Sequence, residues 1–167
     1  MKIITTLSLL LLMMNLVYGQ DEQSDKKEIR KIIHLFQTSI IKKDSVTFDS
    51  LFFKGTVNWI GVVKDRSQQK RIQANPDIKK SDYPGTYKGF FQYVLTKGKK
   101  EEKFKNIRIT NDDVIASVTF DYSFWVDNKM TNWGKECWHL IKINGKWEIT
   151  GIIFSIELSK YFPKPGN

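Results

Sequence analysis

Apolar residues recur at helical spacing in the first third of the chain. Between positions 29 and 40 they fall on one helical face: Ile29, Ile32, Ile33, Phe36 and Ile40. Asp25 and Glu28 stand three residues apart, which is the spacing of a capping box. The pattern therefore predicts an amphipathic helix over residues 26–43. A second, short helix is expected over 45–53, and a third after Pro84-Gly85, where Tyr87, Phe90, Phe91 and Val94 turn inward.

From Lys103 onward the apolar positions alternate, which is typical of strands. Polar turns divide this part of the chain into four segments, 104–110, 114–126, 132–143 and 146–158. The last turn, Asn144-Gly145, has the composition of a two-residue hairpin. A further strand is expected over 55–63, which is rich in β-branched and aromatic residues. Residues 64–82 are polar and basic, and they carry no clear pattern.

Helices followed by a run of strands indicate an α+β fold. We predict a curved, mostly antiparallel sheet of about five strands wrapped around three N-terminal helices. Because long strands twist, such a sheet is expected to enclose a conical pocket against the helices. One domain over residues 26–158 accounts for nearly all of the pattern, and residues 159–167 form a tail.

The chain resembles the nuclear transport factor 2-like superfamily, which includes the SnoaL-like domains. The resemblance rests on the order of the elements over residues 26–158 and on the closing strand "GKWEITGIIFS", in which Trp147, Ile149 and Ser155 match a recurrent pattern. It implies a cystatin-like cone. Enzymes of the superfamily, such as ketosteroid isomerase and scytalone dehydratase, transfer protons inside this cone with a carboxylate or histidine base and tyrosine donors. Members also commonly dimerise through the open sheet face.

Turn geometry predicts which residues share a face. The Asn144-Gly145 turn sets His139 opposite Thr150, and a turn centred on Asn128-Lys129 sets Phe120 opposite Cys137. We therefore expect these residues, with Trp59 from the earlier strand, to line the pocket: Trp59, Phe120, Tyr122, Phe124, Trp133, Cys137, His139 and Thr150. The opposite face is expected to hold Asp121, Trp125, Glu136, Trp138, Leu140, Trp147 and Ile149.

Three functions fit this arrangement. The first, which we favour, is a non-catalytic domain that binds a small apolar or aromatic ligand. The second is an isomerase or dehydratase with His139 as base and Tyr122 as proton donor; a core histidine bonded to Thr150 is the structural alternative. Against catalysis, Gly151 and Ile153 stand where the family often has polar side chains, and no acid is expected on the pocket face. Asp49, in the second helix, could reach the pocket mouth. The third is a homodimer joined through Trp125, Trp138 and Trp147.

The N-terminus predicts export, with an uncleaved membrane anchor as the alternative; the apolar run is somewhat short for a membrane-spanning helix. Residues 1–19 have a lysine, an uncharged apolar run and small residues before the expected cleavage, the features of a signal peptide. Residues 20–25 would form a polar leader. We expect the mature protein to be secreted, or periplasmic in a Gram-negative cell. Cys137 is the single cysteine, so no intramolecular disulfide is possible.

Charge and motifs narrow the partners. The formal net charge is +9, and residues 64–105 hold twelve Lys/Arg against five acids, a balance of +7. This basic segment predicts either solvated lysines or contact with an anionic surface. Export disfavours nucleic acid. With two histidines and no CxxC, glycine-rich phosphate loop or G-x-S-x-G motif, the sequence predicts no metal site and no cofactor.

Overall fold

The computed structural model describes residues 23–165. The expected signal peptide, 1–19, lies outside these residues. Within the part that is described, no helix combines the length and the apolar character needed to span a bilayer.

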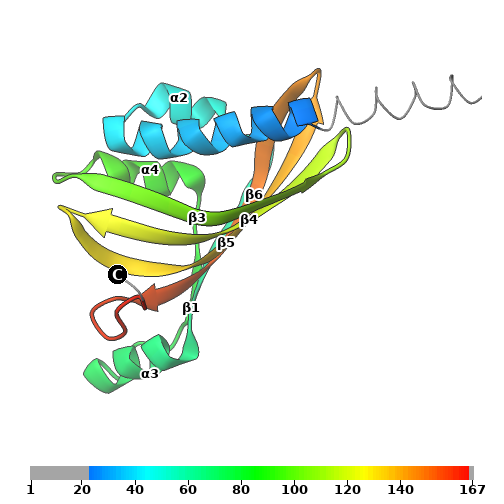
Figure 1. Ribbon diagram of the computed structural model, residues 1–167. Coiled ribbons are helices and arrows are strands. Elements are labelled where there is room, and N and C mark those ends of the chain that lie inside the picture. Colours follow the sequence, from blue (N-terminus) through cyan, green and yellow to red (C-terminus); the bar gives the residue numbers. More distant parts are fainter. Residues whose placement is uncertain (1–22, 166–167) are drawn as a thin grey trace, which may run out of the picture.

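The fold is α+β, as predicted (Figure 1). A helix over residues 23–42 is followed in chain order by the other elements: α2 (Ser45–Ser50), β1 (Asn58–Val63), α3 (Asp65–Ala74), β2 (Asp82–Pro84), α4 (Tyr87–Leu95), β3 (Lys100–Asn111), β4 (Ile115–Val126), β5 (Lys129–Ile143) and β6 (Lys146–Leu158). They form one six-stranded sheet in the order β2-β1-β6-β5-β4-β3. Every strand pair is antiparallel except β1 with β6. The segment without a clear sequence pattern, 64–82, supplies α3, and the additional strand β2 begins at its last residue.

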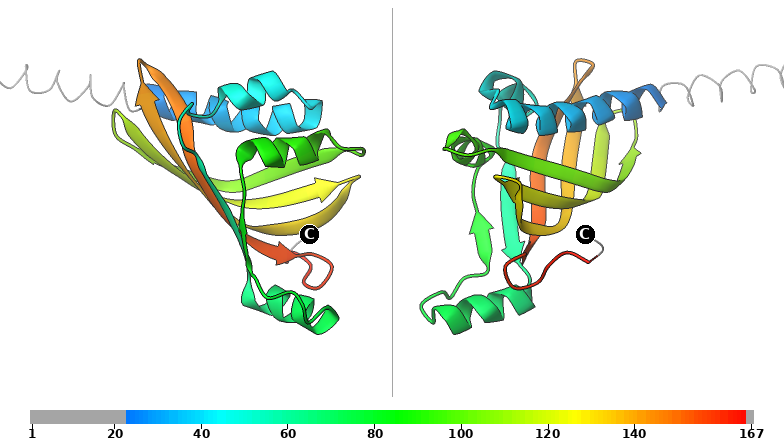
Figure 2. Two further views of the ribbon diagram at one scale, coloured as in Figure 1. Left: turned by 180° about the vertical axis from the view of Figure 1, so that it is seen from behind. Right: turned by 60° about the vertical axis from the view of Figure 1, so that its left-hand side comes forward.

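The sheet curves around three of the helices. Helix 23–42, α2 and α4 lie along the concave side, whereas α3 lies at the far end of the sheet, away from them (Figures 1 and 2). Phe36 joins the layers: its ring centroid lies 5.0 Å from that of Phe48 in α2 and 4.7 Å from that of Trp138 in β5. This aromatic core explains why the helical and alternating apolar patterns predicted the fold correctly.

Asp25 has a different role from the expected one. The helix already includes residue 23, so Asp25 lies inside it and not at its start. Its Oδ1 accepts hydrogen bonds from Trp147 Nε1 at 3.0 Å and from Lys142 Nζ at 2.7 Å. Burial alone would raise the pKa of Asp25, but these two bonds outweigh it and hold the pKa below its ordinary value. The carboxylate thus attaches the helix to the β5–β6 hairpin.

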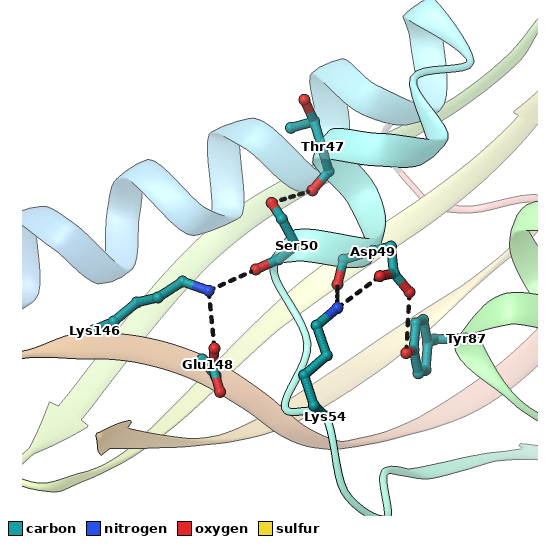
Figure 3. A network of polar contacts seen from close by, with 7 residues as sticks. All are labelled: Thr47, Asp49, Ser50, Lys54, Tyr87, Lys146 and Glu148. Atoms are coloured by element: carbon teal, nitrogen blue, oxygen red, sulfur yellow. Dashed lines mark hydrogen bonds and ion pairs between the residues drawn. The ribbon is translucent and has the colours of Figure 1, made fainter. Parts of the chain in front are cut away.

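A second polar network fixes α2 (Figure 3). Lys54 Nζ donates to Asp49 Oδ2 at 2.6 Å, and the Tyr87 hydroxyl donates to Asp49 Oδ1 at 3.2 Å. Lys146 Nζ donates to the carbonyl of Ser50 at 3.0 Å. The network ties α2 to α4 and β6 from the outside, so Asp49 is a structural anion here; the bond from Lys54 is the main cause of its lowered pKa.

The expected register of β4 with β5 is wrong by one residue. The turn is centred on Asp127-Asn128, both with positive φ, so Val126 pairs with Lys129. The register then shifts between Phe124 and Trp125, which leaves Thr131 as the extra residue of a bulge. In consequence Phe120 lies opposite Glu136, and not opposite Cys137.

The β5–β6 hairpin has the expected turn but gains a bulge further on. Asn144 and Gly145 have φ of 50° and 77°, and Ile143 pairs with Lys146. Beyond the pair Leu140–Ile149 the register shifts, so His139 pairs with Gly151 and not with Thr150. Since a slip of one residue exchanges the two faces of a strand, Glu136 and Trp138 face the helices and Cys137 and His139 face outward.

Candidate functional site

A cavity of about 580 Å³ lies between the concave side of the sheet, β2 and α4. Seven of the eleven residues that line it are aromatic: Trp59, Tyr83, Phe90, Tyr93, Tyr122, Phe124 and Phe154. The other four are Glu102, Asn132, Glu136 and Ile156. Every second residue of a strand points to the same face, and this alternation directs the strand residues among them into the cavity.

The aromatic walls support one another. The ring centroids of Trp59 and Phe90 lie 5.0 Å apart in a stacked arrangement. Phe154 meets Trp59 edge-on at 6.0 Å and Tyr122 edge-on at 6.1 Å. Rings from β1, α4, β4 and β6 therefore form a continuous apolar surface around the cavity.

Two carboxyl groups interrupt this surface. Glu102 in β3 and Glu136 in β5 have only 6% and 4% of their surface exposed. Trp138 Nε1 donates a hydrogen bond to Glu136 Oε1 at 2.5 Å. For Glu102, no group within residues 23–165 hydrogen-bonds to the carboxyl; Gln37 Nε2 reaches only its backbone carbonyl, at 3.0 Å. The Glu102 carboxyl is thus a buried polar group that faces the cavity.

Burial raises the pKa of both carboxyl groups, so each holds its proton up to a higher pH than an exposed glutamate does. It raises the pKa of Glu136 to about 8, although the bond from Trp138 opposes the change. Burial and then the charge of Glu136 raise the pKa of Glu102 well above its ordinary value. Two nearby carboxyls in a low-dielectric site cannot both ionise easily, so the site disfavours a double negative charge.

Tyr122 is held by its hydroxyl, which lies 2.9 Å from the Ser155 carbonyl and 3.1 Å from Asn132 Oδ1. The close approach of that carbonyl requires Gly134, because a Cβ there would lie 2.0 Å from Ser155 O. Burial, followed by the charges of Glu136 and Glu102, raises the pKa of Tyr122 well above its ordinary value. Tyr122 is therefore a weak acid whose donor is already engaged.

The residues that line the cavity include no lysine or arginine. Lys100, buried in β3 two residues from Glu102, directs its ammonium group to the Thr96 carbonyl at 3.2 Å and the Thr96 hydroxyl at 2.9 Å. The same ammonium lies 5.2 Å from the ring centroid of Tyr93. Across residues 23–165, no three His, Cys, Asp or Glu side chains are grouped as metal ligands.

Comparison with known proteins places the fold. No protein-family model matches the sequence, and no curated protein matches it either. Among solved structures, a nuclear transport factor 2-like superfamily protein from Salmonella enterica matches with a TM-score of 0.58 and 20% identity, over 87% of this chain and 96% of that one. A cystatin-like protein of unknown function from Nostoc punctiforme matches with a TM-score of 0.55 and 16% identity, over 80% and 91% of the two chains. The chain has the nuclear transport factor 2-like fold.

A third solved structure with this fold carries a suggested activity. It is a candidate scytalone dehydratase from Novosphingobium aromaticivorans, with a TM-score of 0.61 and 11% identity, over 84% of this chain and 89% of that one. At such low identity, this structural similarity supports the fold alone. It assigns no activity to this chain.

In this nuclear transport factor 2-like cone, the expected pocket residues divide between the two faces. Trp59, Tyr122 and Phe124 line the cavity. Phe120 lies behind it, packed 4.1 Å from Phe104 and 5.2 Å from Trp138 between ring centroids. The remaining four belong to the outer face or its bulge, because of the register shifts: Trp133, Cys137, His139 and Thr150.

The expected catalytic pair is therefore separated. His139 is exposed on the outer face, whereas Tyr122 is buried on the inner one. The Thr150 hydroxyl donates to the His139 backbone carbonyl at 3.1 Å, and the His139 Nε2 lies 4.0 Å from Cys137 Sγ. Burial of the Cys137 thiol raises its pKa, so the thiolate is disfavoured.

The tryptophans expected at a dimer interface are also placed differently. Trp138 and Trp147 belong to the core, with 0% and 3% of their surface exposed. Trp125 is half-buried, and Lys103 Nζ lies 4.3 Å from its ring centroid. The exposed apolar residues of the outer sheet face instead include Ile60, Val62 and Ile153.

Sequence reasoning missed both acids of the cavity. The expected register places Glu136 on the opposite face, and Glu102 lies within the basic segment 64–105, where alternation alone does not single it out. Extending the alternation of the third strand back from Phe104 would have placed Glu102 and Lys100 inside. Tyr83 and Tyr93 carried no comparable indication, since Tyr83 lies just after the unpatterned segment 64–82 and Tyr93 on the polar side of α4.

Proposed function

We propose that this protein is a small-ligand-binding domain that holds its ligand in the aromatic cavity. The observation that carries the proposal is the cavity itself. Its volume of about 580 Å³ falls within the range of roughly 300–1,000 Å³ typical of small-molecule sites. Largely apolar walls with a few convergent polar groups, here Glu102, Asn132 and Glu136, are the usual composition of such a site.

We further propose that binding is non-catalytic and takes place after export. The Tyr122 hydroxyl is committed to Ser155, and His139 lies on the other face, so the acid–base pair expected from the sequence is not assembled. Export rests on the signal-like composition of residues 1–19.

One observation favours a second candidate, proton transfer. Burial brings the pKa of Glu136 to about 8, close to the range in which a carboxyl group can both give and take a proton at neutral pH. Glu136 would then act as the general base or acid of an isomerase or dehydratase. An enzyme of this kind removes and returns a proton at carbon, whereas a binding domain does not. Exchange of a ligand's carbon-bound acidic hydrogens with deuterated solvent would therefore support proton transfer, and its absence would support binding alone.

Native mass spectrometry of the exported protein tests the proposed function. We expect a retained small molecule on the wild type, and an intact mass that reports removal of the signal segment. Ile156→Trp should fill the cavity and abolish the added mass. Ile60→Trp, on the exposed outer face of β1, is the matched control and should retain it. A wild type that carries no molecule and is not stabilised by any small aromatic compound would contradict the proposal.

A further inference from the structure

The ionisable groups of the cavity differ in sign from those of the whole protein. The chain has 27 Lys and Arg against 18 Asp and Glu. The cavity reverses this balance: its walls contain Glu102 and Glu136 and no basic residue. The cavity therefore does not share the basic character of the whole chain. When one of its acids ionises, the charge of the cavity is negative.

The aromatic rings favour the same kind of ligand. The face of an aromatic ring carries a negative partial charge and attracts cations within about 6 Å of its centroid. Tyr93, at the cavity edge, already makes such a contact with the Lys100 ammonium, at 5.2 Å. Six further rings line the same space without a protein cation among the lining residues.

Glu102 indicates that the ligand carries a polar group. Its buried carboxyl has no hydrogen-bond donor within residues 23–165. An apolar neutral ligand that displaces water from the cavity would leave this group without a partner, which is unfavourable. An anion would meet two acids and no basic group. A cation satisfies the carboxyl and the ring faces together.

We infer that the cavity binds a small organic cation, an ammonium group on an apolar or aromatic body, with Glu102 and Glu136 as its counter-charge and the aromatic rings as its walls. The inference rests on the proposed ligand-binding function and specifies its ligand class. Trp59, Phe90 and Phe154 supply ring faces, and one of the two carboxyls, once ionised, supplies the charge.

Binding should release a proton. Burial raises the pKa of both carboxyl groups, and a cation stabilises the ionised form of one of them. The titratable and charged groups around them are Tyr83 from β2, Tyr93 from α4, Lys100 from β3 and Tyr122 from β4. β1 and β6 present Trp59, Phe154 and Ile156, which do not titrate. Tyr122, with its raised pKa, stays protonated, so the carboxyls set the pH dependence.

The test compares benzyltrimethylammonium with neopentylbenzene, its uncharged carbon analogue, by titration calorimetry on the purified protein. Because benzyltrimethylammonium has no titratable proton, any pH dependence belongs to the protein. Its affinity should rise about tenfold per pH unit up to the pKa of Glu136, about 8, and level off above it. At pH 8.5 the cation should bind at least about tenfold more tightly than the analogue.

Variants locate the effect. In Glu102→Gln/Glu136→Gln the shape of the cavity is kept but neither group ionises, so the preference for the cation and its pH dependence should disappear. Glu101→Gln is the matched control, since Glu101 lies on the opposite face of β3 and pairs with Lys99 and Lys103. Far-ultraviolet circular dichroism verifies that each variant is folded.

The outcomes separate this inference from the proposed function. Equal binding of both compounds, or a cation affinity that is unchanged between pH 6 and pH 8.5, overturns the inference and leaves the binding function in place. Binding of neither compound overturns the inference, and an absence of any retained ligand in the mass spectrum then overturns the proposed function as well.

Discussion

Replacing Glu136 by glutamine should change the pH dependence of stability. Glutamine keeps the shape of the side chain, and its carbonyl oxygen can still accept the hydrogen bond from Trp138 Nε1. It removes only the ability to ionise. In the wild type, the pKa of Glu136 is raised from its ordinary 4.5 to about 8 in the folded state. Between these two pH values the unfolded chain is ionised at this position while the folded protein holds the proton.

The sign follows from proton binding. Stability falls with rising pH wherever the folded state binds more protons than the unfolded state. Below pH 4.5 both states are protonated and Glu136 adds no pH dependence; above pH 8 both are ionised and its effect is constant. The interval of about 3.5 pH units, at about 1.4 kcal/mol each, gives a wild-type loss on the order of 5 kcal/mol relative to Glu136→Gln. Water entry into the cavity reduces this, so we expect at least about 2 kcal/mol.

Urea denaturation at half-unit steps from pH 4 to pH 9 measures the effect. The difference in unfolding free energy between Glu136→Gln and wild type should be small at pH 4, grow with pH and reach a plateau near pH 8 to 9. Groups that titrate elsewhere, such as Asp25 and Asp49, cancel in this difference. Glu101→Gln should show no such growth, because Glu101 lies on the surface of β3 with lysine partners. A difference that is the same at pH 5 and pH 9 would refute a raised pKa at Glu136.

Three further predictions concern the sheet. Gly134→Ala should destabilise the protein by about 1–3 kcal/mol in urea denaturation, since its Cβ would lie 2.0 Å from Ser155 O and displace the partner of Tyr122; unchanged stability would contradict this packing. His139→Gln should leave ligand affinity within about twofold by calorimetry, because the side chain is exposed on the outer face, and a large loss would return His139 to the site. If two copies pair through the outer face, Ile153→Glu should convert a dimer to a monomer on a sizing column while circular dichroism stays unchanged, because Ile153 is 49% exposed there.

The fold followed from the sequence because periodicity reports burial directly. Phe36 and Ile40 recur at helical spacing, and Val118, Phe120 and Tyr122 alternate as a half-buried strand does. Those patterns survive any error in pairing, since each is local to one element. The same holds for Asn144-Gly145, whose residues tolerate the positive φ values of a tight hairpin.

The faces of β5 did not follow, because they depend on two bulges. Thr131 and Thr150 are the extra residues, and threonine is enriched in regular strands, so its presence does not indicate a bulge. Each bulge moves the register by one position, and one position exchanges the faces. Apolar content gave no correction, since β5 alternates Trp133, Cys137 and Ile141 with Trp138 and Leu140. Both of its faces therefore looked suitable for burial.

The acids of the cavity show a different limit. A charged residue in an alternating strand is ordinarily assigned to solvent, and this is correct for Glu101 and Lys103. Glu102 breaks the rule, and the reason is visible only in three dimensions: its side chain faces a cavity and not packed apolar side chains. A local violation of patterning of this kind is expected where function, and not stability, selects the residue.

Cation binding and proton transfer differ in where the proton of Glu136 goes or comes from, so a count of released protons distinguishes them. A cation held against Glu136 stabilises its ionised form, which lowers its pKa and makes it a weaker base. A proton then leaves for the solvent once per binding event. A base that acts on a neutral substrate must instead take its proton from carbon, and at pH 7 only about a tenth of a group with a pKa of about 8 is ionised to do so. Calorimetry in two buffers of different ionisation enthalpy counts protons released on binding. Close to one proton per cation at pH 7 supports a counter-charge role, whereas none would show that the carboxyls do not respond to the ligand's charge.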